Sequence, residues 1–403
     1  MNTEIEYTKA EYQKILEEFL GRTESEDLIN HVFSGYSSNN SGLSYNFSDT
    51  FRIRSVIDRI ITITEKKLTS IKHLHLLLNL AKLSLNRGEL FLSSDIYSQV
   101  LFRTTNKEEF QAQSANALKG LGEVSALQAK WNESFSYVRK AKKIFEQIND
   151  IKGVASCENV LGTFYAERGV LDSAKEFFES GLNRLKGKKS DNLDALILVN
   201  LGILKNMIGN TDEAESNYRK ALKKFEEFND TKRIAVTHHN LGMLFTKLGE
   251  YKQALNEFNI SVEISNKDKN LLTLAISYLG KAYIYAEMNE LDLASDFIER
   301  GMDLSNQLND RLTIADVYKV KGIIEKKYKR YDLAESYLLT SLRINGELGN
   351  KLNHAETSYE LGLLQFELNQ PQKALTYLKT ALKYFTKIKA TSEINKIESL
   401  LNK

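Results

Sequence analysis

The chain has 403 residues, and its 55 Lys and Arg residues nearly balance 53 Asp and Glu residues, giving a formal net charge of +2 at pH 7. This balance excludes the strong uniform field by which bulk charge favours nucleic acid or an acidic membrane. The single cysteine, Cys157, excludes an intramolecular disulfide and a zinc site built from cysteines. We therefore expect Cys157 to be a small packing residue.

Proline and apolar runs are scarce in this sequence. Pro371 is the only proline, and because proline removes a backbone donor and breaks helix interiors, its scarcity predicts nearly continuous helix. Pro371 itself falls where the first turn of a helix is expected, a position that tolerates proline. The N-terminal residues lack the apolar core of a signal peptide, and no apolar run approaches the roughly 20 residues that span a bilayer. We expect a soluble, cytoplasmic protein without a membrane partner.

Residues 1–70 are predicted to form an N-terminal helical segment. An apolar stripe at helical spacing runs over residues 12–20, and Thr23 begins a sequence typical of a capping box that opens a second helix. Residues 34–50 are rich in Ser, Asn and Gly, which predicts a loop, and residues 51–68 predict a third helix. This segment is interpreted either as a cap over the helices beyond residue 70 or as an effector module that those helices control; we favour the cap.

From about residue 71 the chain is periodic. A small residue recurs in steps of 41 once and then 40 six times, and a second small residue comes twelve positions after it. Small residues at fixed phases predict points where two helices approach too closely for a large side chain, and a large apolar residue four positions further on is expected to fill the space between them. The first series is Ala81, Gly122, Gly162, Gly202, Gly242, Ala282, Gly322 and Gly362; the large residues are Tyr97, Val138, Phe178, Tyr218, Phe258, Ile298, Leu338 and Leu378.

Each period is therefore expected to be a helix–turn–helix that must stack on its neighbours to bury its apolar face. Asn, Asp and Gly cluster between the periods, at Asn149-Asp150, Asn229-Asp230, Asn309-Asp310 and Gly349-Asn350. These residue types suit a helix C-terminus followed by a turn.

The pattern resembles the tetratricopeptide repeat, most completely at Leu161-Gly162, Ala174, Phe178 and Gly181 and again at Leu201-Gly202, Ala214, Tyr218 and Ala221. The usual unit of that family has 34 residues, and the longer unit here is similar to those of Pins/LGN-type, MalT-type and Rap-type arrays. Lys281 and Lys321 depart from the motif, which has Leu at their position. The resemblance implies an all-α, right-handed superhelical solenoid of about eight units over residues 71–388, closed by a C-terminal capping helix at 389–403.

No motif of catalysis, cofactor binding or metal binding emerges. His73 and His75 are two apart and His238 and His239 are adjacent, whereas a helical metal pair needs a spacing of three or four. No phosphate-binding glycine loop, HExxH or nucleophile elbow occurs. We predict no enzymatic activity, no catalytic residues, no cofactor and no metal.

Basic residues gather at equivalent places in two repeats, within residues 139–143 and 219–224. They could form a stripe that holds phosphates, and salt-dependent binding would then be expected. Acidic residues such as Glu146 and Glu226 are interspersed, and Lys near a helix C-terminus is favoured by the macrodipole. We interpret the clusters as solvated helix surface and do not expect a nucleic-acid partner.

The resemblance implies that the first helix of each unit lines an inner, concave face where a peptide or protein ligand binds. Asn at the position before Leu-Gly suits a peptide, because an amide both donates to and accepts from an extended backbone. The implied binding residues are Asn159, Asn200, Asn206, His239, Asn240, Lys247, Lys319 and Tyr359; the same positions also give Glu167, Lys326, Lys327, Glu360 and Glu367.

The sequence thus predicts a protein- or peptide-binding scaffold. One alternative is a receptor for a signalling peptide, similar to Rap proteins, whose N-terminal segment engages an effector. A second is a structural subunit of a homo-oligomer. The oligomeric state, a dimer included, and the identity of the partner are left open.

Overall fold

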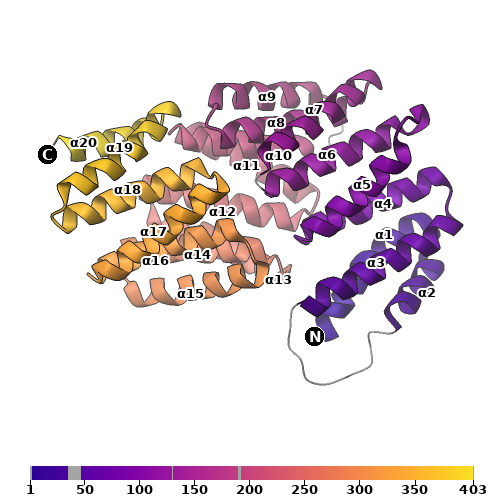
Figure 1. Cartoon of the computed structure of the whole chain (residues 1–403), viewed down its shortest axis with the longest axis horizontal. Coiled ribbons are helices and arrows are strands. Elements are labelled where there is room, and N and C mark those ends of the chain that lie inside the picture. The colour runs from indigo at the N-terminus through magenta and orange to yellow at the C-terminus, as the bar shows by residue number, and fades with distance from the viewer. Residues whose placement is uncertain (1, 35–46, 129, 189–191, 403) are drawn as a thin grey trace. The chain divides into compact units, whose positions relative to one another are not determined.

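The computed structural model describes residues 2–34, 47–128, 130–188 and 192–402, and these are drawn in colour in Figure 1. They form helices and turns, with no strand among them. The chain divides into two compact units, one ending at Cys157 and the other beginning at Glu158. The prediction of an all-α array of stacked helix pairs is confirmed.

Among the described residues, three helices precede the repeats, eight helix pairs come next, and one last helix ends the series. The bounds are α1 (Asn2–Leu20), α2 (Arg22–Phe33), α3 (Phe47–Lys67), α4 (Ser70–Asn86), α5 (Leu90–Thr104), a short 3₁₀ turn (Glu108–Phe110), α6 (Gln111–Leu127), α7 (Trp131–Gln147), α8 (Ile151–Glu167), α9 (Leu171–Leu185), α10 (Leu193–Met207), α11 (Thr211–Glu227), α12 (Thr231–Leu248), α13 (Tyr251–Lys267), α14 (Leu271–Glu287), α15 (Leu291–Leu308), α16 (Arg311–Lys327), α17 (Tyr331–Leu348), α18 (Lys351–Glu367), α19 (Pro371–Lys387) and α20 (Thr391–Leu401). Pro371 is the first residue of α19, as predicted.

In the first unit, α1–α3 share one apolar core with α4–α6. Tyr12 and Leu16 of α1 are fully buried, as are Leu76 and Leu77 of α4. The predicted capping box is wrong: α2 begins at Arg22 after Gly21, whose φ of 80° only glycine adopts readily, so Thr23 lies inside the first turn. The predicted loop at 34–50 falls mostly on residues 35–46, outside the described residues.

Within each pair, the small residue of the first helix faces the large residue of the second. A Cβ added at Gly162 would lie 2.4 Å from the ring of Phe178, and one at Gly202 would lie 2.5 Å from the ring of Tyr218. The added Cβ of Gly322 would lie 2.6 Å from Leu338. These approaches confirm the small-to-large register predicted from the period of 40, and they explain why most units need glycine there.

The turns between pairs use the residues that the sequence places there. Asn149, Asn229 and Asn309 have φ values of 55°, 52° and 49°, the left-handed conformation that ends a helix and that Asn tolerates. The following Asp then begins the next helix: the carboxylate of Asp230 accepts a hydrogen bond from the backbone N–H of Arg233 at 3.3 Å.

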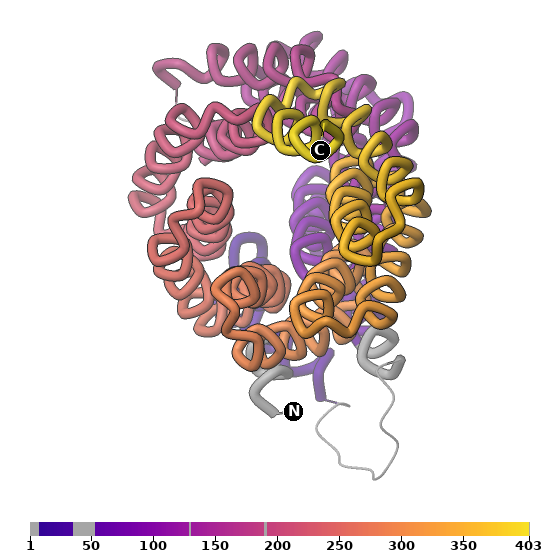
Figure 2. Tube along the Cα trace, turned by 90° about the vertical axis from the view of Figure 1, so that its left-hand side faces the viewer, coloured from indigo at the N-terminus to yellow at the C-terminus, as the bar shows by residue number. Residues whose placement is uncertain are grey.

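In the second unit the first helices of successive pairs contact one another more closely than the second helices do, which places α10, α12, α14, α16 and α18 on the inside of a curve. Figure 2 shows this unit bending round until its C-terminal end, in yellow, comes back beside its beginning. Leu171 and Met207 pack against the apolar cluster of α19 and α20, so the return is a real contact. We use "inner face" below for the inward side of these first helices and of α8.

In the part of the chain that the structure describes, no helix combines the length and apolarity needed to cross a membrane.

Candidate functional site

A row of asparagine amides crosses three neighbouring inner helices, α8, α10 and α12. The side-chain amide of Asn200 donates a hydrogen bond to the side-chain oxygen of Asn159 at 2.8 Å. The amide nitrogen of Asn240 and the side-chain oxygen of Asn206 are buried and find no partner among the described residues. The row therefore keeps one donor and one acceptor that the protein itself does not satisfy.

His239 and Lys247 of α12 flank this row. The Nδ1 atom of His239 lies 3.2 Å from the Ser277 hydroxyl, and its ring packs at 5.4 Å from that of Phe258. Burial lowers the pKa of His239 to about 4, so the imidazole is neutral at pH 7. Lys247 donates a hydrogen bond to the backbone oxygen of Asn206 at 2.9 Å and pairs with Glu393 of α20 at 2.8 Å.

The inner positions of α14, α16 and α18 carry charges instead of amides. Lys326 pairs with Glu360 of α18 at 2.9 Å, and Lys327 pairs with Glu287 of α14 at 3.2 Å. Burial opposes the charge of Lys326, but the nearby carboxylate of Glu360 outweighs it and raises the pKa of Lys326. Three neighbouring helices are thus joined across their inner sides by ion pairs.

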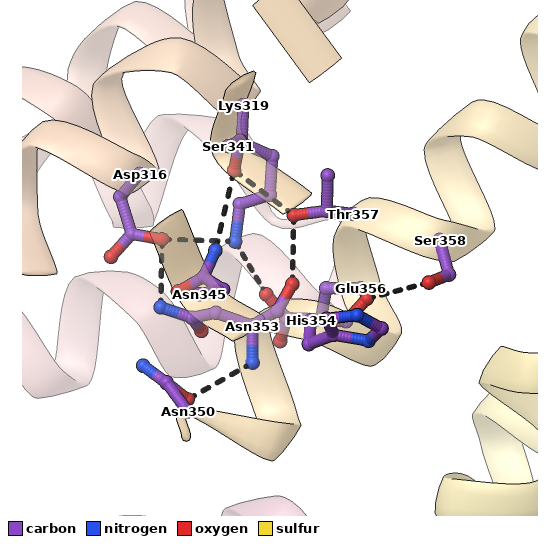
Figure 3. Close-up of polar contacts among 10 residues, drawn as sticks. All are labelled: Asp316, Lys319, Ser341, Asn345, Asn350, Asn353, His354, Glu356, Thr357 and Ser358. Atoms are coloured by element: carbon purple, nitrogen blue, oxygen red, sulfur yellow. Dashed lines mark hydrogen bonds and ion pairs between the residues drawn. The ribbon is translucent and has the colours of Figure 1, made fainter. Parts of the chain in front are cut away.

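Lys319 is the centre of a partly buried polar network (Figure 3). Its ammonium lies 2.6 Å from Glu356 and 3.3 Å from Asp316, and Asn353 donates a hydrogen bond to Asp316 at 2.8 Å. Burial alone would lower the pKa of Lys319, but the charges of Glu356 and then Asp316 raise it, so the side chain stays protonated. A buried hydroxyl pair, Ser341 with Thr357 at 3.2 Å, lies beside the network.

The structure brings Asn159, Asn200, Asn206, Asn240, His239 and Lys247 onto three adjacent helices. It places Lys319 and Tyr359 elsewhere, on α16 and α18, where Lys319 is held by carboxylates and Tyr359 packs against the C-terminal apolar cluster. The assignment of both groups to a ligand stays a prediction.

The sequence analysis does not predict the ion pairs between inner positions, although Lys326, Lys327 and Glu360 are among the inner-face residues that it names. These ion pairs could have been predicted by comparing equivalent positions of successive repeats. Glu287, Lys327 and Glu367 are 40 residues apart, and their charges alternate in sign. Residues at one phase of neighbouring repeats are adjacent in space, so alternating signs predict a ladder of ion pairs.

The basic clusters, the possible metal ligands and Cys157 do not form a comparable site among the described residues. Within the basic clusters, Lys142 pairs with Glu146 at 2.5 Å and Lys224 with Asp194 at 2.6 Å, so part of their charge is neutralised. Among the described residues, no group of three or more His, Cys, Asp or Glu side chains is arranged to hold a metal ion. Cys157 is fully buried, as expected of a packing residue.

Comparisons with known proteins agree on the fold. The tetratricopeptide repeat model matches residues 193–267, 233–307 and 313–387. The comparison with curated protein sequences finds no match. Among solved structures, the apo form of the quorum sensor NprR from B. thuringiensis is similar with a TM-score of 0.57 and 15% identity, over 92% of this chain and 99% of that one.

Two further structures are similar. The Rap conjugation gene regulator of the plasmid pLS20, solved with a Phr peptide, has a TM-score of 0.58 and 14% identity, over 96% of this chain and 97% of that one. The hetero-tetramer Cut9–Hcn1 has a TM-score of 0.53 and 16% identity, over 94% of this chain and 64% of that one. At such identities the likeness establishes a shared fold. Residues 193–307 and 313–387 therefore carry tetratricopeptide repeats, and the chain as a whole shares the fold of such arrays.

Proposed function

We propose that the chain is a binding scaffold whose inner face, at α8, α10 and α12, holds a peptide or an extended protein segment. The observation that carries the proposal is the asparagine row with its unpartnered atoms, Asn240 Nδ2 and Asn206 Oδ1. Every residue of an extended segment other than proline offers one backbone N–H and one C=O.

The energetics favour such a ligand. A buried donor or acceptor without a partner costs about 1–3 kcal/mol, so a ligand that supplies the partner recovers that amount. Amide contacts of this kind are made to the backbone and carry little sequence information. Side-chain selection would fall to the flanking apolar positions, where Ile203 and Met243 are exposed at 39% and 45%.

The test is capture of partners from a lysate of the source organism, read by mass spectrometry. The intact chain is compared with the paired variant Asn200→Ala and Asn240→Ala. A matched control carries Asn256→Ala and Asn259→Ala, which alter two exposed asparagines on α13. We expect the inner-face variant to lose a peptide or protein that the control retains. Equal capture by all three proteins would place the binding surface elsewhere.

A second candidate is a regulatory receptor in which the N-terminal helices engage an effector. It is supported by likenesses to NprR and the Rap regulator that extend over 92% and 96% of this chain, because such coverage takes in most of α1–α3. Glu26 and Asp27 are exposed on α2. Replacing both by Lys should remove an effector from the captured set while the inner-face ligand is retained. If capture is unchanged, this surface of α2 engages no effector.

A further inference from the structure

The return of α19 and α20 to the beginning of the second unit forms a junction unlike any between successive repeats. The Lys387 ammonium donates a hydrogen bond to the backbone oxygen of Arg168, just beyond the end of α8, at 2.7 Å. The neighbouring Gly169 lies so near Ile388 that an added Cβ would be 3.1 Å from it. We call this junction, made by residues 384–393 with residues 167–172, Met207 and Lys247, the seam.

The seam combines apolar packing of Leu171 and Met207 against α19 and α20 with a small set of polar contacts. Lys389 pairs with Asp172 at 3.1 Å, but these side chains are 74% and 84% exposed, and an ion pair so open to water contributes little. Lys247 and Glu393 are 21% and 23% exposed, so their pair is the better shielded one. The second carboxylate oxygen of Glu393 is buried and has no hydrogen-bond partner within the described residues, which weakens even this contact.

Lys247 belongs to two structures at once. It is an inner-face residue of α12, beside the asparagine row, and its ammonium also holds the first turn of α20 through Glu393. The ammonium has three N–H donors, of which the Asn206 carbonyl and Glu393 take two. A ligand carboxylate at the third would lie beside the carboxylate of Glu393, and the two negative charges would repel each other. Binding at this end of the inner face and closure of the seam therefore compete for one side chain.

We propose that α20 is an autoinhibitory latch: Glu393 occupies Lys247 and closes the second unit on itself, and a ligand that takes Lys247 releases the seam. Release by a ligand rests on the proposed function, whereas closure of the seam by Glu393 and Lys247 does not. The matching ligand group is an anion or a strong hydrogen-bond acceptor, such as a carboxylate of a peptide.

The latch is tested without any ligand by zero-length carbodiimide cross-linking of the full chain. Lys389 with Asp172 reports on the seam, and Lys321 with Glu299, 2.8 Å apart across an ordinary repeat junction, reports on the array. The variant is Glu393→Gln. Its matched control is Glu398→Gln, which alters an exposed carboxylate of the same helix.

We expect Glu393→Gln to lower the equilibrium constant for seam closure by about two- to fivefold, the effect of losing one partly exposed ion pair, and to lower the yield of the seam cross-link by up to that factor. The array cross-link should stay unchanged, and Glu398→Gln should change neither. An unaltered seam yield in Glu393→Gln overturns the latch. So does an equal loss of both cross-links, because the seam would then not be a separate junction.

The competition is tested with a synthetic library of random octapeptides, acetylated and amidated, that carry one fixed Glu or, in a parallel pool, one fixed Gln. A third pool with fixed Gln keeps a free C-terminal carboxylate, which distinguishes side-chain from terminal anions. The Glu393→Gln chain should retain carboxylate-bearing peptides better than the Glu398→Gln chain, and addition of Lys247→Met should abolish the gain.

The outcomes of the library experiment separate the two proposals. Equal retention by the Glu393→Gln and Glu398→Gln chains would overturn the competition. If retention depends on Asn200 and Asn240 but not on Lys247, the inner face binds peptides and only the latch proposal fails. If it depends on neither the asparagines nor Lys247, the proposed function fails as well, whereas the cross-linking result on the seam is unaffected.

Discussion

The inner face of the second unit has two regions built from the same repeat and opposite chemistry. Across α8, α10 and α12 the inner positions are mostly amides, with Asn200 bonded to Asn159 and the amide nitrogen of Asn240 left unpartnered among the described residues, and Lys247 is the charged exception. Across α14, α16 and α18 they are charges, and Lys326 and Lys327 are each paired to a carboxylate of a neighbouring helix.

This difference in chemistry indicates that one region binds a ligand and the other stabilises the array. A ligand backbone can bind the asparagine row without breaking many of the row's own hydrogen bonds, because it supplies partners to atoms that have none. A ligand at the charged region must first separate ion pairs that join neighbouring repeats, and removing one partner of a buried pair leaves the other charge uncompensated. We infer that the amide region receives the ligand and that the charged region maintains the curvature.

The strongest test of this comparison is Lys319→Met. Lys319 is 14% exposed and neutralises both Glu356 and Asp316, which are 41% and 32% exposed, so its loss should lower the free energy of unfolding by about 2–3 kcal/mol, less than for a fully buried pair. The matched control is Lys327→Met, whose pair with Glu287 is 26% and 29% exposed and should contribute about 1 kcal/mol or less. Urea unfolding measures both, and similar losses would contradict the supporting role of the Lys319 network.

Both regions rest on the same packing of a small residue against a large one between paired helices. Overpacking at the small residue should therefore destabilise both regions to a similar extent. Gly202→Leu would drive a side chain into the ring of Tyr218, and Gly322→Leu would do so into Leu338. Each should lower the free energy of unfolding by at least about 1–3 kcal/mol.

The control for overpacking is Gly346→Ala, because the nearest atom, on His354, is 3.8 Å from an added Cβ. Removing a helical glycine at this open site should stabilise the protein by about 0.5–1 kcal/mol. Unchanged melting temperatures of the two leucine variants would refute the repeat register.

The register of helix packing could be predicted because small and large residues recur at fixed positions in every repeat. The turns could be predicted for a similar reason, since Asn229 adopts the left-handed conformation and Asp230 begins the next helix. Lys281 and Lys321 depart from the motif, yet they fit: Lys281 lies 4.1 Å from the centre of the Phe297 ring, and Lys321 pairs with Glu299 at 2.8 Å. An alkyl stem can pack where Leu would while its charged end finds an external partner.

The seam could not be predicted from the period. Whether α20 returns to α8 and α12 depends on small rotations summed over many repeats, and the sequence pattern specifies each stacking step but not their sum. The pairing of Lys247 with Glu393 joins positions 146 residues apart, from 247 to 393, which no local spacing reveals. Asn206 and Asn240 were named as binding residues, but their unpartnered atoms appear only in the packed structure.

A smaller effect is expected in the amide region. Asn200→Ala removes the hydrogen bond to Asn159 at a partly buried site, which should lower the free energy of unfolding by about 1 kcal/mol. Asn256→Ala, on the exposed side of α13, should be neutral by the same urea measurement. A loss as large as that of Lys319→Met would mean that the amides are structural, and the distinction between the two regions would fail.

The smallest expected effect is on the pH dependence of unfolding, and it also distinguishes the amide region from the charged region. The folded-state pKa of His239, about 4, lies below the value of about 6.5 in an unfolded chain, so the unfolded state takes up the proton first as the pH falls. The stability from this neutral imidazole is complete above about pH 6.5 and is lost as the pH falls toward 4. His239→Gln should therefore flatten the pH dependence of unfolding in this window, whereas His31→Gln, on the exposed side of α2, should leave its slope unchanged. Burial also lowers the pKa of His354 on α18 and of His73 on α4, so some acid sensitivity must survive in the His239 variant. Hydrogen exchange at pH 5 resolves these contributions by helix: the protection that His239→Gln restores should lie in α12, and restoration in α18 would show that the acid response belongs to the charged region.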